Sequence, residues 1–115
     1  MTPSTVLIVD DEELIRWSLA EHLKGEGYDI IQGENGVQAL EQVRAGAPDL
    51  ILLDLKMPEM DGLTALRKLR EEGYETPVVV LTAHGGVDRA VEATRLGASD
   101  YLSKPFELRE ISIAV

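Results

Sequence analysis

The stretch "LIVDDEELIR", residues 7–16, joins an apolar run to four consecutive acids, Asp10 to Glu13. Similar apolar runs, "LILL" at residues 50–53 and "VVVL" at residues 78–81, alternate with longer amphipathic stretches. Because these runs are continuous rather than alternating, they predict strands that are buried on both faces of a parallel sheet. The sequence therefore predicts an α/β fold with a doubly wound sheet covered by helices.

Five strands and five helices are expected, separated by Gly, Pro, Asn or Asp. The predicted strands are Thr5–Asp10, Tyr28–Gln32, Leu50–Asp54, Val78–Thr82 and Ser99–Leu102. The predicted helices are Glu13–Lys24, Gly36–Ala45, Leu63–Glu72, Val87–Leu96 and Leu108 to the chain end. The chain shows no repeat or internal linker and reads as one domain, residues 1–115. Its last helix reaches "ISIAV" without a polar tail, which favours a domain cut from a longer protein within that helix.

The composition excludes several classes of protein. The 115 residues are 44% hydrophobic and 28% charged, which is typical of a single globular domain. A formal net charge of -10 argues against binding to nucleic acid or to an anionic membrane, so a protein partner is expected. The chain has no cysteine, no signal peptide and no apolar stretch of the roughly 20 residues that span a membrane. It is therefore interpreted as cytoplasmic.

Three carboxylates are expected to share one crevice. Ligands of a doubly wound sheet bind beyond the carboxyl ends of its strands, where Asp10, Asp11 and Asp54 should lie. Such a cluster is costly unless a cation neutralises it, and oxygen ligands suit Mg²⁺, which favours sites that also hold phosphate. The alternative is that Asp11, Glu12 and Glu13 only cap a helix and complement its dipole. That alternative leaves Asp54 unexplained.

Two further side chains are expected at the same edge of the sheet. Thr82 ends the fourth strand and offers a hydroxyl donor, and Lys104 follows the fifth strand and offers a fixed positive charge. The formal charges of the three carboxylates, Lys104 and Mg²⁺ cancel. A phosphoryl group on Asp54 would then leave surplus negative charge, toward which Thr82 and Lys104 should move.

Four motifs in order resemble the receiver domain of bacterial two-component response regulators. They are "VDD" at residues 9–11, "DLKMPEMDG" at 54–62, "LTA" at 81–83 and "DYLSKPF" at 100–106. The resemblance covers essentially the whole chain and implies a flavodoxin-like sheet with strand order 2-1-3-4-5. It also implies that Asp54 accepts a phosphoryl group from a sensor histidine kinase.

The resemblance assigns roles to the residues of the expected site. Asp11 would bind Mg²⁺ directly and Asp10 largely through water, with Asp54 and the backbone carbonyl of Lys56 completing the protein ligands. Thr82 and Lys104 would contact the phosphoryl oxygens.

Three further positions have family counterparts. Tyr101 occupies the rotating aromatic position of the family's switch, although an aromatic in a strand is more often plain core. The family's cis bond would fall between Lys104 and Pro105. His84 lies where the family varies its dephosphorylation rate, although a lone exposed histidine is more often incidental. The switched surface would comprise the helix at 87–96, the strand at 99–102 and the last helix.

A finer resemblance concerns the output. "DDEELIRWSL", "LTAHGGVDRAVEA" and "GASDYLSKPFEL" look like receivers of the nitrogen-regulation subfamily, which precede an ATPase that activates sigma-54 RNA polymerase. The nucleotide-binding motif G-x-x-x-x-G-K-[ST] is absent from these 115 residues. The expected partners are therefore a sensor kinase, an output domain outside this chain and a second receiver. The resemblance implies a regulatory phosphoacceptor rather than an enzyme.

The first helix predicts a kinase contact. Ile15, Leu19 and Leu23 recur every four residues and should face the sheet, which places Trp17 and Leu14 on the opposite side. These two apolar side chains would then be exposed near the rim of the site. The alternative is that Trp17 packs on a neighbouring helix.

Three alternative functions need residues that differ from those of this chain or do not need all of them. A dehalogenase-type phosphatase needs a second acid two residues after its nucleophile, where this chain has Lys56. A flavin carrier needs a hydroxyl-rich and glycine-rich loop after the first strand, where this chain has "DDEE". A receiver-like docking module that is never phosphorylated would not need all five site residues.

Overall fold

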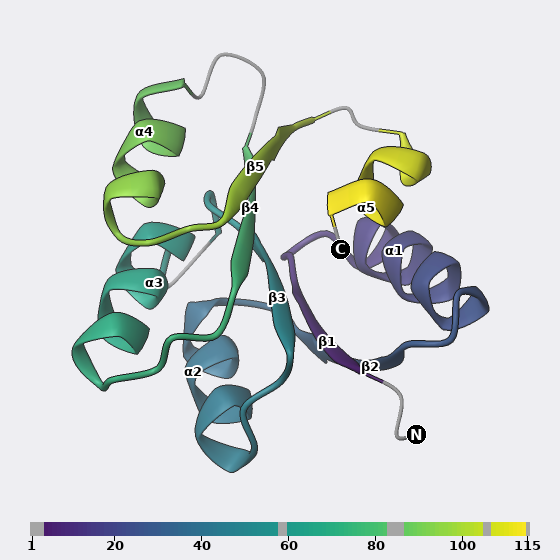
Figure 1. Ribbon diagram of the computed structural model, residues 1–115, viewed down its shortest axis with the longest axis horizontal. Helices are drawn as coiled ribbons and strands as arrows, with labels where there is room; N and C mark the ends of the chain where they lie inside the picture. Colours follow the sequence, from purple (N-terminus) through teal and green to yellow (C-terminus); the bar gives the residue numbers. More distant parts are fainter. Residues whose placement is uncertain (1–3, 58–59, 83–86, 105–106, 115) are drawn as a thin grey trace.

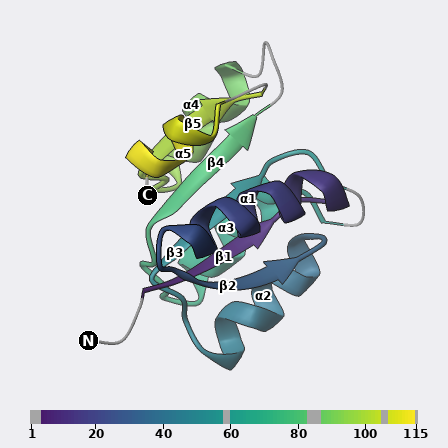
Figure 2. The same ribbon diagram turned by 90° about the vertical axis from the view of Figure 1, so that its right-hand side faces the viewer.

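The computed structural model describes residues 4–57, 60–82, 87–104 and 107–114, and it forms one five-stranded sheet (Figure 1). All neighbouring strands run parallel in the order β2-β1-β3-β4-β5, as the sequence predicts. In the turned view of Figure 2 the arrowheads of β1, β2 and β4 point the same way. The strands are β1 (Thr5–Val9), β2 (Asp29–Gly33), β3 (Leu50–Asp54), β4 (Val78–Thr82) and β5 (Asp100–Ser103).

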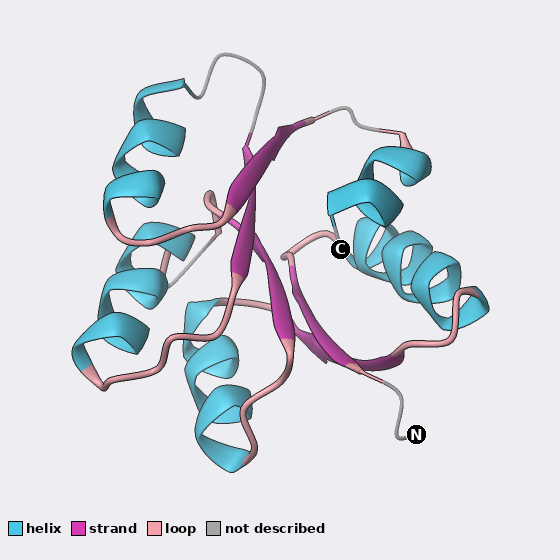
Figure 3. Ribbon diagram, viewed as in Figure 1, coloured by secondary structure: helices cyan, strands magenta, loops and turns pink. Residues whose placement is uncertain are grey.

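Helices cover both faces of the sheet, so the fold has three layers. α2, α3 and α4 lie on one face, and α1 and α5 lie on the other (Figure 3). The helices are α1 (Glu13–Gly25), α2 (Gly36–Ala45), α3 (Gly62–Glu71), α4 (Val87–Arg95) and α5 (Leu108–Ala114). Among the described residues, the structure contains no helix with the length and apolar character needed to cross a membrane.

The two faces of the central strands build two apolar clusters. Leu7 and Val9 of β1 pack toward α2 and α3, while Val6 and Ile8 pack toward α1. All five residues of β4 are buried, which explains why its sequence is continuous rather than alternating. Since burying one such side chain contributes about 1.5–3 kcal/mol, β1, β3 and β4 dominate the stability of the fold. The edge strand β5 is mostly exposed.

The register brings four strand ends to one edge. Val9 pairs with Leu53, Asp54 pairs with Leu81, and Thr82 pairs with Ser103. The residues that follow β1 and β5 therefore lie beside the ends of β3 and β4. This is the arrangement that the sequence predicts for the acids, Thr82 and Lys104.

The predicted element bounds differ from the structure by one residue at most. β1 ends at Val9 rather than Asp10, although the Asp10 amide still donates to the Gly33 carbonyl at 3.2 Å. The Asp10 carbonyl instead accepts from the side chain of Arg16 at 2.7 Å, so the strand pairing stops there. β2 and β5 each lie one residue further along the chain than predicted.

The close approach of α3 to the end of β3 requires a glycine. A Cβ at Gly62 would collide with the Asp54 carbonyl oxygen and would lie 2.8 Å from Leu55 Cα. These atoms are backbone, so they cannot swing away. We predict that Gly62→Ala lowers the free energy of unfolding by about 3 kcal/mol in urea denaturation.

The matched control is Gly25→Ala, because a Cβ at Gly25 meets nothing within 4 Å. That variant should change the free energy of unfolding by less than about 1 kcal/mol. Equal effects of the two substitutions would show that the contact with β3 does not constrain position 62.

Candidate functional site

The three predicted acids meet beyond the ends of β1 and β3. Carboxylate oxygens of Asp10, Asp11 and Asp54 all lie within 4.8 Å of one another. Asp10 is fully buried and Asp54 is only 4% exposed, whereas Asp11 faces solvent. Two buried carboxylates at this distance repel each other strongly, because little water screens them.

Lys104 supplies the positive charge that the sequence predicts. Its ammonium nitrogen Nζ lies 2.8 Å from Asp10 Oδ2 and 3.5 Å from Asp54 Oδ2. Burial opposes the charge of Lys104, but the hydrogen bond to Asp10 and the nearby carboxylates outweigh burial and raise the pKa of the ammonium above its usual value. The lysine therefore stays charged and leans toward Asp10.

The surroundings of Asp54 disfavour the ionised form of its carboxyl group. Burial, followed by the charge of Asp10, raises the pKa of Asp54 to about 7, although Lys104 opposes the shift. The backbone N–H of Lys56 also donates to Asp54 Oδ1 at 3.3 Å. Near neutral pH this carboxyl group is poised between its protonated and ionised forms, and additional positive charge would favour the ionised form.

Thr82 and Tyr101 lie at the ends of neighbouring strands. Thr82 is buried at the end of β4, and its carbonyl accepts a hydrogen bond from the backbone N–H of Lys104 at 2.7 Å. Tyr101 in β5 is 48% exposed, so the alternative that it is a plain core aromatic is wrong. The reason is that β5 is the edge strand of the sheet and most of its residues are exposed.

The helix-capping alternative holds only for Glu13, which lies in the first turn of α1, where an acid complements the helix dipole. Glu12 is the N-cap residue of α1, and its side chain makes no capping hydrogen bond. Instead, Asp10 Oδ1 accepts from the backbone N–H of Glu12 at 2.9 Å. The acid that supports the start of the helix is therefore the buried one, which also belongs to the cluster.

The apolar residues predicted for a kinase contact are exposed. Leu14 is 74% and Trp17 58% exposed, so Trp17 is not buried against a neighbouring helix. Leu19 and Leu23 are buried against the sheet as predicted, and Ile15 is half-buried beside them. The sequence predictions for His84 and for the bond before Pro105 fall outside the described residues.

Arg16 was missed by the sequence analysis. It is 8% exposed, and its guanidinium reaches the backbone carbonyl of Asp10. Arg16 precedes Leu19, Ala20 and Leu23 at spacings of three, four and seven residues along the buried face of α1. That spacing was the available signal, but an arginine normally indicates a solvent-exposed position.

The donor set fits a hard divalent cation. The cluster offers only carboxylate oxygens, with one exposed acid that leaves water access, and Mg²⁺ prefers oxygen ligands and retains several waters. The structure provides no cysteine or histidine among the clustered ligands of its described part, so a zinc site is not indicated there.

Comparison with known proteins identifies the family. The model of the response regulator receiver domain matches residues 6–115. This chain belongs to the response regulator receiver domain family. Receiver domains generally bind Mg²⁺ at an acidic pocket and work with a sensor kinase, which agrees with the cluster at the ends of β1 and β3.

The relatives include transcription regulators. The receiver domain is 43% identical over 110 residues to the regulatory protein AtoC and 42% identical over 110 residues to the DNA-binding transcriptional regulator NtrC, both of Escherichia coli K12. The alignments cover 96% of this chain but only 24% of either relative. The crystal structure of the receiver domain of NtrX from Brucella abortus superposes with a TM-score of 0.89 at 34% identity, covering 95% of this chain and 92% of that one.

The pKa of Asp54 predicts how stability depends on pH. Because its pKa rises from about 4 in the unfolded chain to about 7 in the folded domain, the folded state binds more protons at this group between those values. The contribution of Asp54 to the free energy of unfolding is therefore present below pH 4 and is lost as pH rises to 7. The prediction concerns the change in the free energy of unfolding that Asp54→Asn causes in the absence of divalent cations. This change should be more favourable at pH 8 than at pH 4 by about 2–4 kcal/mol.

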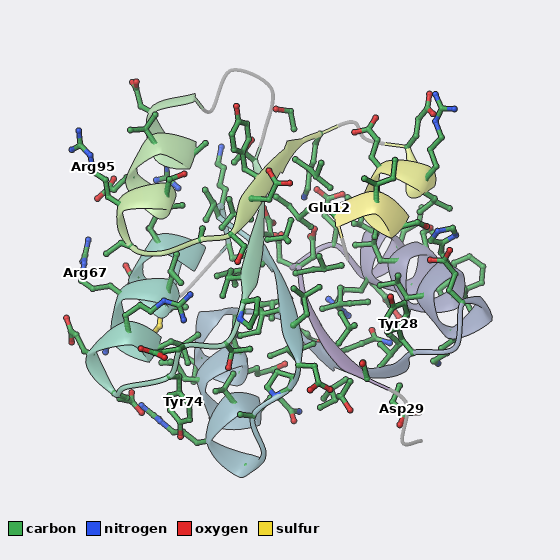
Figure 4. The ribbon with its side chains drawn as sticks, in the orientation of Figure 1. Glu12, Tyr28, Asp29, Arg67, Tyr74 and Arg95 are labelled. Carbon is green, nitrogen blue, oxygen red and sulfur yellow. The ribbon has the colours of Figure 1, made fainter. Side chains whose placement is uncertain are left out.

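The control is Asp29→Asn, because Asp29 is exposed and lies at the opposite end of the sheet from Glu12 (Figure 4). In urea denaturation in EDTA at several pH values, the free energy of unfolding of Asp29→Asn should differ from that of the native domain by an amount that does not change with pH, because this variant keeps Asp54. A pH profile that Asp54→Asn leaves unchanged would contradict the raised pKa. Added Mg²⁺ should reduce the difference in the free energy of unfolding between the native domain and Asp54→Asn at pH 8.

Proposed function

We propose that this receiver domain accepts a phosphoryl group from a sensor histidine kinase on Asp54, in the presence of Mg²⁺. The observation that carries the proposal is the convergence of Asp10, Asp11 and Asp54 within 4.8 Å beside the Lys104 ammonium group. A cluster with this much negative charge gains stability from a cation, and a cation in turn favours phosphate oxygens.

The transfer uses Asp54 as the nucleophile. A carboxylate oxygen of Asp54 forms a bond to phosphorus as the phosphorus–nitrogen bond of a phosphohistidine breaks, and the departing imidazole keeps the electron pair. Asp10, Asp11, Asp54 and the Lys56 carbonyl would hold Mg²⁺, which would neutralise charge on the phosphoryl oxygens. Only ionised Asp54 reacts, so its raised pKa makes the metal-free domain a poor acceptor below neutral pH.

Lys104 and Thr82 would respond to the new charge. Lys104 is bonded to Asp10 at 2.8 Å and is 3.5 Å from Asp54, so a short movement of its flexible side chain would pair it with a phosphoryl oxygen. The Thr82 hydroxyl would donate to another phosphoryl oxygen. Tyr101 would take the space that Thr82 leaves, and the surface of α4, β5 and α5 would change.

The proposed output is control of transcription, of the sigma-54-dependent kind that the sequence resemblance implies. Support comes from the similarity to AtoC and NtrC, of whose length this chain spans 24%. The output domain, a second receiver as partner and the cytoplasmic location stay predictions. We likewise propose a regulatory phosphoacceptor rather than an enzyme, because the Lys56 side chain stands where a phosphatase of the dehalogenase type needs an acid.

We predict that acetyl phosphate and Mg²⁺ add one phosphoryl group to Asp54. Intact-mass spectrometry should show one phosphoryl group on the native domain and none on Asp54→Asn, because the acid cluster and Lys104 converge beside Asp54. Asp11→Ala should weaken Mg²⁺ binding more than Asp10→Ala does.

The matched control is Asp29→Asn, which should be phosphorylated like the native domain. Phosphorylation of Asp54→Asn, or phosphorylation that EDTA does not diminish, would overturn the mechanism. A native domain that is never modified but still binds its partner would favour the docking module instead.

Leu14 and Trp17 are proposed to contact the kinase, since both are exposed on α1 close in sequence to the acids. Trp17→Ala should slow phosphoryl transfer from the kinase about tenfold or more, as loss of a large aromatic contact does at protein interfaces. The reaction of Trp17→Ala with acetyl phosphate should be unchanged, because Trp17 does not belong to the acid cluster. Equal slowing with both donors would show damage to the fold rather than loss of docking.

A further inference from the structure

Arg16 stands out among the buried residues of the described chain. The buried polar and charged residues there are Asp10, Arg16, Asp54 and Thr82, and the other three all belong to the site. A buried guanidinium is costly unless its hydrogen bonds are satisfied. Its partners therefore indicate what its burial achieves.

The polar contacts of Arg16 differ in length. Its Nη1 donates to the Asp10 carbonyl at 2.7 Å, whereas Nε lies 3.4 Å from Gln32 Oε1. The nearest carboxylate is Glu34, at 3.8 Å from Nη2, and the Glu34 side chain is 64% exposed. Arg16 is therefore held by a main-chain oxygen of the acid cluster rather than by a counter-ion.

Every polar group of Asp10 is engaged. Its N–H donates to the Gly33 carbonyl at 3.2 Å, Oδ1 accepts from Glu12 N–H at 2.9 Å, and Oδ2 accepts from Lys104 at 2.8 Å. Arg16 occupies the remaining group, the carbonyl. That carbonyl belongs to the planar peptide unit joining Asp10 to Asp11, so holding it fixes the position of Asp11 Cα. The bond from the Glu12 N–H to Asp10 Oδ1 restrains the chain on the other side of Asp11, and the two bonds together limit the directions that the Asp11 side chain can take.

We propose that Arg16 is a positioning residue of the cation site, which holds the Asp10–Asp11 peptide so that the Asp11 carboxylate faces the ion. The inference rests on the proposed function, because it presupposes that the cluster binds a divalent cation. Its basis is geometric: Arg16 Nη1 donates to the Asp10 carbonyl at 2.7 Å, and carboxylate oxygens of Asp10, Asp11 and Asp54 lie within 4.8 Å of one another. Groups that orient metal ligands typically change metal affinity 10- to 100-fold when removed.

The experiment measures Mn²⁺ binding to the purified domain by electron paramagnetic resonance, with Mn²⁺ as the probe for Mg²⁺. Arg16→Met should lose about 10- to 100-fold in affinity. Arg16→Lys should recover part of that loss, because an ammonium group can still donate to the Asp10 carbonyl. The control replaces Gln32 and Glu34 together by alanine, which leaves the Arg16–Asp10 bond, and it should bind within about twofold of the native domain.

A double-mutant cycle with Asp11→Ala separates positioning from general damage. If Arg16 acts through Asp11, Arg16→Met should cost less than about twofold in the Asp11→Ala background. The same loss in both backgrounds would overturn the proposal, and so would native-like affinity of Arg16→Met. Should Arg16→Met fail to fold in urea titration, the same cycle with Arg16→Lys decides between these outcomes.

The failures of the two proposals remain distinguishable. A native domain that does not bind Mn²⁺ or Mg²⁺ contradicts the proposed function itself. A native domain that binds the ion while the Arg16 variants bind equally well contradicts only the positioning role.

Discussion

Mutual repulsion of the carboxylates at the ends of β1 and β3 is the constraint on which the rest of the site depends. The sheet register places Asp54 directly beside the residues that follow Val9, and burial keeps water from screening the charges. The folded domain tolerates the cluster through Lys104 and through partial protonation of Asp54, whose pKa is raised to about 7. A divalent cation would relieve the same repulsion, and a phosphoryl group would renew it. The chemistry of the site follows from this repulsion between the carboxylates.

The surroundings of the cluster divide into a rigid part and a responsive part. β1, β3 and β4 are buried on both faces, so the ends that carry Asp10, Asp54 and Thr82 are fixed by the core. β5 lies at the edge and is mostly exposed, and Lys104 follows directly after it. When the charge at the ends of β1, β3 and β4 changes, β5 is therefore the nearby strand that can adjust at low cost, since fewer buried contacts oppose the movement of β5.

The sequence predicts this arrangement well where a single physical rule decides it. Continuous apolar runs such as "VVVL" require burial on both faces, and the parallel sheet then brings Asp10, Asp54 and Lys104 to one edge. The identities of the acids, the threonine and the lysine, together with their order, carried the family resemblance. The helical period also favoured the exposure of Leu14 and Trp17, although it left open that Trp17 packs on a neighbouring helix, and the structure excludes that packing.

Other features depend on tertiary geometry that no local pattern contains. The preference of Lys104 for Asp10 over Asp54 is a matter of distances set by the packing of β5. Burial of Arg16 contradicts the usual behaviour of arginine, and only the structure explains it, because the guanidinium donates to the carbonyl of Asp10. The exposure of Tyr101 depends on the position of β5 at the edge of the sheet, which the strand's own sequence does not specify.

The central claim is that charge added at Asp54 is transmitted to the surface of α4, β5 and α5. The most direct measurement is the change in backbone amide NMR shifts when beryllofluoride, a stand-in for the phosphoryl group, is added with Mg²⁺. The account predicts shifts at Asp10, Asp11 and Asp54 and also at Tyr101 and along α4, with the distant shifts largely lost in Thr82→Ala although the analogue still binds. Shifts confined to the acid cluster in the native domain would contradict it.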